Sequence, residues 1–301
     1  MYSEKPVAAT LEEGQLILQA ARGKGLQVGC APDTFLGARP QTMRKVITDG
    51  GIGVPVAATC FMLCHGHEHW HPSPEFYYRT GAGPLFDMGP YYVTMLTALF
   101  GPAKKVCGIA GTSFKKRLIT SEPLAGTLVD VEVPTHVSGT IEFENGVIAT
   151  LITSFDVWDS KLSRVEIYGS EGTIAMDDPD PLGGPNSYGG DLKYRNKDQS
   201  DWNEFPHSMP RKTEASPWDI RTDKLDYSVN SRGLGLADMA RGIMTGTKFR
   251  ATGEMAYHVL EIMMGLIESS ETGAFYELKS TCEIPELLPE GLPEFSMGVG
   301  C

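Results

Sequence analysis

The sequence predicts an α/β segment followed by a larger α+β region with a mostly antiparallel sheet. Up to about residue 53, a helix, a short strand and a second helix follow one another, the order typical of an α/β sheet. From Pro55 onward, several stretches alternate apolar and polar residues, as strands with one covered face do. We therefore divide the chain near Gly53, into residues 1–53 and 54–301.

The first segment begins with a helix expected from Thr10 to Arg22. Thr10 with Glu13 three residues later is a capping-box signature, and glycines at 23 and 25 end the helix. Residues 26–30, LQVGC, then form a short buried strand, and a second helix is expected over Pro40–Thr48.

The second region is expected to be rich in strands. Asn145-Gly146 predicts a tight hairpin turn between two of them. The expected strands are 56–63, 131–144, 147–155, 164–168 and 172–176. Residues 179–199 are rich in Pro, Gly, Asn and Asp and predict an exposed excursion. Helical periodicity returns over 234–244 and 253–270.

Residues Gly81–Gly101 predict one helix of about four turns, with Pro84 near its first position. Pro90 removes one intrahelical hydrogen bond unless it lies in a first turn. One face of this helix is apolar, and the opposite face carries Asp87, Tyr91, Thr94 and Ala98. Asp87 and Tyr91 are four residues apart and would stand side by side, which makes them the first candidates for proton chemistry.

Composition excludes some classes of protein. The formal charge is 26 − 38 = −12, and no basic run exceeds Lys115-Lys116-Arg117, which we expect to be a solvated loop. Nucleic acid and anionic membrane are therefore poor partners. No apolar run approaches the ~20 residues of a membrane span, and the N-terminus lacks signal-peptide features, so we expect a soluble cytoplasmic protein. The six scattered cysteines favour reduced thiols.

Four of the seven histidines lie within residues 60–71, which makes this segment the best metal candidate. His67, His69 and His71 would share one face of a strand, and zinc accepts imidazole ligands. No second cluster with helical spacing accompanies them, so we expect a loop over the substrate cleft and no metal. His258 lies inside a predicted helix, where a buried histidine with satisfied nitrogens is the expected interpretation.

Two motifs resemble the signatures of one enzyme family. Tyr2-Ser3-Glu4-Lys5-Pro6 resembles the Glu-Lys-Pro motif of the Gfo/Idh/MocA oxidoreductases, and residues 81–89, GAGPLFDMG, resemble their glycine-rich motif that ends in an aspartate. Their separation of about eighty residues also fits, as do residues 31–37 and 230–233. The resemblance implies a Rossmann-type dinucleotide-binding domain, followed by a large open-sheet domain that is covered by helices and forms homo-oligomer contacts.

The resemblance also implies NAD- or NADP-dependent chemistry on a sugar, polyol or glycoside hydroxyl. Lys5, within the cofactor-binding motif Glu4-Lys5-Pro6, would lie beside the nicotinamide, and Asp87 would orient the substrate. Many relatives have a histidine where this chain has Tyr91, so the acid–base residue is left open between Tyr91 and His71. A tyrosine pKa of about 10 must be lowered for this role, and the Lys5 ammonium could lower it. Trp70, His71 and Arg79 are expected to border the substrate.

Each of the three predicted catalytic residues also has an interpretation without a catalytic role. Lys5 would be a solvated lysine near the chain terminus, Asp87 a helix N-cap, and Tyr91 a buried tyrosine.

The glycine-rich G-x-G-x-x-G fingerprint of a dinucleotide fold is absent. Gly81-Ala82-Gly83 lacks the third glycine, and Gly233-Leu234-Gly235 leads to Asp238. The resemblance therefore implies that residues 1–53 are the C-terminal remnant of the nucleotide-binding domain. If the protein starts at Met1, NAD(P) binding is expected to be weakened or lost.

Two other functions stay open on the sequence. Some relatives cleave glycosides by a redox-assisted reaction with tightly held NAD, and release of aglycone without net NADH would distinguish this reaction from simple oxidation. The missing fingerprint also allows a non-catalytic sugar-binding or assembly module, which catalytic turnover would exclude.

Overall fold

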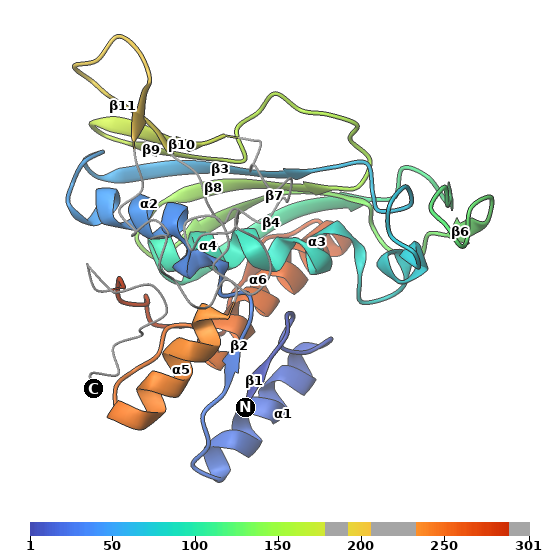
Figure 1. Ribbon diagram of the computed structural model, residues 1–301, viewed down its shortest axis with the longest axis horizontal. Helices are drawn as coiled ribbons and strands as arrows, with labels where there is room; N and C mark the ends of the chain where they lie inside the picture. Colours follow the sequence, from blue (N-terminus) through green and yellow to red (C-terminus); the bar gives the residue numbers. More distant parts are fainter. Residues whose placement is uncertain (178–191, 206–232, 289–301) are drawn as a thin grey trace, which may run out of the picture.

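A large sheet forms the centre of the computed structural model, which describes residues 1–177, 192–205 and 233–288 (Figure 1). The strands run in the order β12-β11-β10-β9-β3-β8-β7-β4-β13. β3 and β8 are parallel, and the other neighbouring pairs are antiparallel, as the sequence predicts. The strands are β3 (Pro55–Leu63), β4 (Ala103–Gly111), β7 (His136–Phe143), β8 (Ile148–Ser154), β9 (Val165–Gly169), β10 (Gly172–Met176), β11 (Leu192–Asn196), β12 (Asn203–Phe205) and β13 (Tyr276–Glu277).

Several strands form where apolar and polar residues alternate. In β7, for example, Val137, Ile141 and Phe143 are buried on one face, and the polar residues Thr140 and Glu142 lie between them in the sequence. The predicted hairpin is confirmed: β7 and β8 pair across a turn in which Gly146 has a φ of +87°. Strand β4 was not predicted. The expected exposed excursion is wrong over 192–196, which form β11, and its residues 179–191 lie outside the described chain.

The helices cover one face of this sheet (Figure 1). α6 packs on β4, and α4 lies between α6, α2 and β3. Glycine permits the close approach of α6, since a Cβ on Gly139 would lie 2.5 Å from Leu266 Cδ2. The helices are α1 (Leu11–Gly23), α2 (Ala38–Thr48), α3 (Gly83–Asp87), α4 (Gly89–Phe100), α5 (Leu234–Thr245) and α6 (Gly253–Thr272), with short 3₁₀ helices η1 (Thr34–Leu36) and η2 (Pro74–Tyr78). No described helix is long and apolar enough to cross a bilayer.

The prediction of one continuous helix over 81–101 is wrong. The chain breaks at Met88 into α3 and α4, and Pro90 lies in the first turn of α4, where its missing N–H costs no hydrogen bond. The prediction of a second face that does not pack, opposite the apolar stripe, is also wrong, because Thr94 and Ala98 are buried. Helices pack on that side of α4 as well, so most of α4 is enclosed.

The N-terminal segment packs against helices from the other end of the chain. α1 begins at its predicted cap, where Thr10 Oγ1 accepts a 3.2 Å hydrogen bond from the Glu13 N–H. The expected strand over 26–30 is shorter than predicted: β2 (Gly29–Cys30) pairs in parallel with β1 (Tyr2–Ser3). β2 contacts both α5 and α6. The division near Gly53 and the origin of residues 1–53 as a domain remnant stay predictions.

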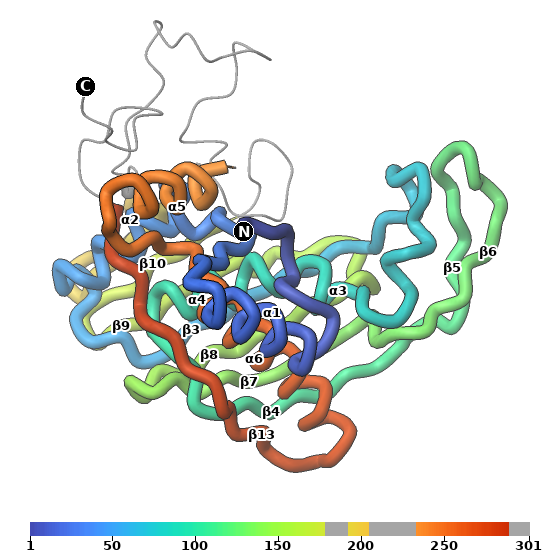
Figure 2. The backbone as a smooth tube through the Cα atoms, turned by 90° about the horizontal axis from the view of Figure 1, so that it is seen from below, coloured from blue at the N-terminus to red at the C-terminus, as the bar shows by residue number. Residues whose placement is uncertain are grey.

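A two-stranded arm extends from one end of the large sheet. It consists of β5 (Lys116–Leu118) and β6 (Leu128–Asp130), which pair in antiparallel fashion, and Figure 2 shows it standing apart from the helices. The connection between its two strands lies against the loop that follows β3, through backbone hydrogen bonds from Thr120 and Ser121 to the Glu68 carbonyl, both 2.9 Å long. The arm therefore helps to fix that loop.

Candidate active site

The two motifs that carry the family resemblance meet at an ion pair. Lys5 follows β1, and Asp87 is the last residue of α3. Lys5 Nζ lies 2.8 Å from Asp87 Oδ1 and also donates to the Asp87 backbone carbonyl. The two side chains are only 15% and 17% exposed, so water screens the pair weakly. The fold thus brings together two of the three predicted catalytic residues, which are far apart in the sequence.

Asp87 is held as a carboxylate. Burial raises its pKa, but hydrogen bonds from His67 and Lys5, together with the positive charge of Lys5, outweigh burial and hold the pKa below its usual range. A carboxylate is an acceptor only, so both of its oxygens require donors. Lys5 supplies the donor at Oδ1, and His67 Nε2 lies 3.2 Å from Oδ2. The Asp87 carboxylate therefore contacts both the Lys5 ammonium and the His67 imidazole.

His67 is the residue that sequence reasoning missed at this site, having considered it only as a metal ligand. It lies in the loop after β3, is buried, and its ring is enclosed by Trp70, Tyr77 and Phe155 at centroid distances of 5.3, 4.2 and 4.7 Å. No spacing rule connects it to Asp87, which lies on a short helix 20 residues further along. Only the tertiary fold reveals the contact.

Tyr91, the third predicted catalytic residue, lies in the first turn of α4 rather than on one helix with Asp87. Lys5 Nζ stands 5.2 Å from the centroid of its ring, a cation–π contact. A different tyrosine, Tyr77, also lies near the carboxylate: burial, with the charge of Asp87, raises its pKa to about 12. Tyr77 is thus a protonated hydrogen-bond donor at neutral pH.

The three residues predicted to border the substrate, Trp70, His71 and Arg79, differ in their contacts with the group around Asp87. Trp70 is 56% exposed and meets the ring of His67 edge-on. His71 is the next residue in the chain, and its Nδ1 accepts a 3.0 Å hydrogen bond from the Ser73 N–H. Arg79 is exposed at the end of η2.

In the predicted cofactor motif, Glu4 is exposed, and its carboxylate lies 3.4 Å from the Lys5 N–H. The next residue is Pro6, and the Lys5–Pro6 peptide bond is cis.

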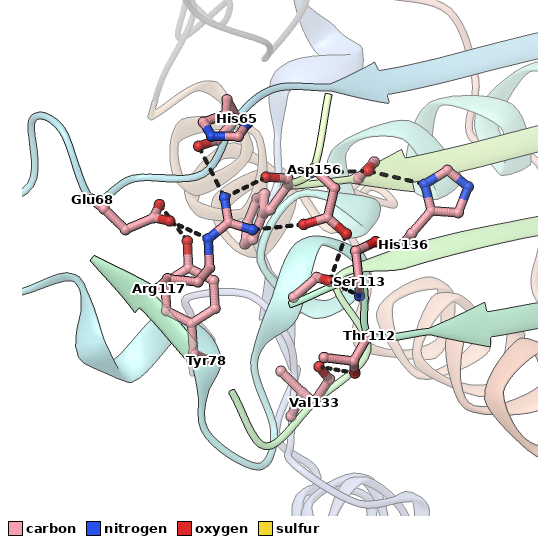
Figure 3. Close-up of polar contacts among 12 residues, drawn as sticks. His65, Glu68, Tyr78, Thr112, Ser113, Arg117, Val133, His136 and Asp156 are labelled. Atoms are coloured by element: carbon pink, nitrogen blue, oxygen red, sulfur yellow. Dashed lines mark hydrogen bonds and ion pairs between the residues drawn. The ribbon is translucent and has the colours of Figure 1, made fainter. Parts of the chain in front are cut away.

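A buried charge network adjoins the loop that carries His67 (Figure 3). Arg117 of β5 is 5% exposed, and its Nε donates to the Glu68 carboxylate. Its Nη1 lies 2.6 Å from Asp156 Oδ1, and its Nη2 donates to the carbonyls of His65 and Phe155 at 3.2 and 2.9 Å. Tyr78 donates to Glu68 Oε2 at 2.5 Å.

The prediction of a solvated basic loop is therefore wrong for Arg117. Neighbouring residues of a strand point to opposite faces. Lys116 is exposed and pairs with the exposed Asp130, whereas Arg117 points inward to two buried carboxylates. Arg117 thus joins the arm, the loop after β3 and the loop after β8.

The described residues fit only one end of a dinucleotide. Lys5 and Asp87 could face the reacting end of a nicotinamide. The best glycine-rich candidate for a pyrophosphate site is the start of α5, but there the Gly233 and Gly235 N–H groups donate to Asp33 Oδ2 at 2.8 and 2.9 Å. A carboxylate already occupies the place an anion would take. Within the described ranges, no group of three or more His, Cys, Asp or Glu side chains is placed to hold a metal ion.

Comparison with known proteins identifies one domain of the chain. Residues 41–175 match the GFO/IDH/MocA C-terminal domain. The 1,5-anhydro-D-fructose reductase of Ensifer adhaerens is 27% identical over 179 residues, which cover 57% of this chain and 47% of that protein. The chain thus spans about half the length of this curated relative.

Two solved structures share the fold. The aldose–aldose oxidoreductase of Caulobacter crescentus, complexed with glycerol, gives a TM-score of 0.66 at 17% identity, covering 92% of this chain and 71% of that one. An Agrobacterium radiobacter oxidoreductase in complex with NAD⁺, L-tartaric acid and magnesium gives 0.67 at 12% identity, covering 92% and 72%. These findings show that the chain carries a GFO/IDH/MocA C-terminal domain over residues 41–175 and that it shares its fold with these two oxidoreductases.

Proposed function

We propose that this protein is an NAD(P)-dependent oxidoreductase that acts on a hydroxyl group of a sugar, polyol or glycoside. The observation that carries the proposal is the partly shielded pair of Lys5 and Asp87, 2.8 Å apart, contributed by the two family motifs. The names of the reductase from Ensifer adhaerens and the aldose oxidoreductase from Caulobacter crescentus favour a carbohydrate-like substrate. NAD(P), when bound, would supply the hydride acceptor or donor for the carbon that bears the hydroxyl.

Lys5 is suited to bind the oxygen of that hydroxyl. An ammonium group has three N–H donors, and Asp87 takes two of them through its carboxylate and its backbone carbonyl. The third donor is available to a substrate oxygen, where it would stabilise negative charge as the O–H proton leaves. Asp87 fixes the direction of the ammonium, and the exposed indole of Trp70 offers a flat apolar surface for the C–H face of a sugar ring.

The proposal is tested by following nicotinamide absorbance with NAD⁺ and NADP⁺ against a panel of sugars, polyols and glycosides. We expect turnover of at least one member, lowered roughly 100-fold to 10,000-fold by Lys5→Ala. Lys24→Ala is the matched control, because Lys24 is an exposed lysine of the same segment, at the end of α1. Absence of turnover, together with no binding of NADH or NADPH, would refute the proposal and favour a sugar-binding or assembly module.

We also propose that the protein forms a homo-oligomer through the open face of its sheet. Ile109 of β4 and Ile148 of β8 are exposed on the face opposite the helices. A mass measured by light scattering should correspond to a multiple of 32.7 kDa and fall to one chain for Ile109→Asp. A wild-type mass of a single chain would exclude this contact.

A further inference from the structure

We infer that His67, from the loop after β3, is the acid–base residue of this site. The loop thereby supplies the imidazole that α4 lacks at Tyr91. Because this role needs a substrate hydroxyl, it rests on the proposed function. It replaces the choice between Tyr91 and His71, and it is carried by the contact of His67 with Asp87.

The contact with Asp87 determines which nitrogen of His67 is free. Nε2 lies 3.2 Å from the carboxylate oxygen Oδ2, which can only accept, so we assign the proton of the neutral ring to Nε2. The lone pair is then on Nδ1. Nδ1 has no hydrogen-bond partner among the described residues and is not closed off from solvent. It is therefore free to exchange a proton with a substrate.

The step balances in both directions. In oxidation, the substrate O–H bond breaks and an Nδ1–H bond forms, while the O–H electron pair becomes the second bond of the carbonyl. The same carbon would give up its hydride to the nicotinamide cofactor of the proposed function. The resulting imidazolium faces the Asp87 carboxylate, which stabilises its charge in the way the aspartate of a catalytic triad does. In reduction, Nδ1–H returns the proton to the oxygen.

The other candidates are less suited to this role. The lone pair of His71 Nδ1 is taken by the Ser73 N–H. Tyr77, with its pKa raised to about 12, holds its proton too strongly to act as a base near neutrality. His67, by contrast, lies 3.2 Å from Asp87 Oδ2 through its Nε2.

The network around Arg117 positions His67. Glu68, the next residue, is held by its carboxylate to Arg117 and Tyr78, and by its carbonyl to the Thr120 and Ser121 N–H groups. The His67 carbonyl is also occupied, by the His71 N–H at 3.0 Å. The backbone on both sides of the imidazole is thus fixed. Arg117 acts through Glu68 and is a positioning residue.

The first test is nitrogen NMR of the histidine rings, which needs neither cofactor nor turnover. We expect His67 to be the Nε2–H tautomer in the wild-type protein and to lose this preference in Asp87→Asn. A His67 ring protonated mainly at Nδ1, or one unaffected by Asp87→Asn, would overturn the assignment.

The second test is turnover. His67→Gln should lower it about 100-fold to 10,000-fold, with NADH binding retained. His69→Gln, an exposed histidine of the same loop, is the control and should leave turnover unchanged. Tyr91→His in the His67→Gln background should restore part of the rate, because it returns an imidazole to α4. Full activity of His67→Gln would refute the role of His67 while leaving the proposed function intact, whereas a wild-type protein that shows no turnover and binds neither NADH nor NADPH would refute both.

Discussion

The substitution Arg117→Met should destabilise the protein strongly. It leaves the buried carboxylates of Glu68 and Asp156 without their cation, and the carbonyls of His65 and Phe155 without a donor. Removing one partner of a buried ion pair costs about 3–5 kcal/mol. A chain of this size should then unfold roughly 10 °C lower in a thermal scan. Urea unfolding followed by circular dichroism measures the free-energy difference directly.

Lys116→Met is the matched control, since Lys116 is the neighbouring cation and its partner Asp130 is exposed. An exposed pair contributes about 0.2–1 kcal/mol, so the control should stay within that range. A loss below about 1 kcal/mol for Arg117→Met as well would refute the view that the network is buried and interdependent.

Acid should reduce the difference between the wild-type protein and Arg117→Met. Burial raises the pKa of Asp156, but hydrogen bonds from Ser113, Thr135 and Arg117 outweigh burial and hold it below its usual range. A lowered folded-state pKa contributes stability that is present above the unfolded value, about 3.9, and is lost as the pH falls through the folded value. The two unfolding curves should therefore converge at low pH.

Two further substitutions test the backbone and the core. Gly83→Ala should cost about 1–3 kcal/mol and disturb the Lys5–Asp87 pair, because Gly83 has a φ of +85° and its new Cβ would lie 2.9 Å from the Pro134 carbonyl oxygen. Gly81→Ala, at a φ of +87° but in open space, should cost only the backbone strain, about 1 kcal/mol, and equal urea midpoints for the two variants would contradict the clash. His258→Gln should remove a pH dependence of the free energy of unfolding, because burial lowers the pKa of His258 to about 4. Relative to acid pH, the neutral ring contributes up to about 3 kcal/mol of stability above pH 6.5, and this contribution is lost as the pH falls toward 4. The same acid loss in wild type and variant, measured by urea unfolding, would assign that dependence to other groups.

Local sequence signals predicted elements well where the signal itself is local. The α1 cap, the Asn145-Gly146 turn and the alternation in β7 each depend on residues within a few positions. Predictions from the sequence failed where burial and contacts depend on residues that are close in space but distant in the chain. The apolar and polar positions of α4 suggested two faces, but α2 and η1 cover the second face, so Thr94 is buried despite its hydroxyl. Arg117 was misread for the same reason, because its partners lie 49 and 39 residues away.

The same distinction between local signals and tertiary contacts applies to the candidate site. Lys5 and Asp87 were found because each belongs to a motif that resembles the family, yet nothing in either motif gives their distance. The position of Lys5 depends on a chain of contacts: β1 pairs with β2, Gly29 of β2 bridges to Thr252, and Thr252 caps α6, which packs on the large sheet. His67 reaches Asp87 through another such chain, in which Glu68 is held by Arg117 of the arm. The geometry at the carboxylate is therefore set by packing far from it, and substitutions at Arg117 should alter that geometry without touching any reacting group.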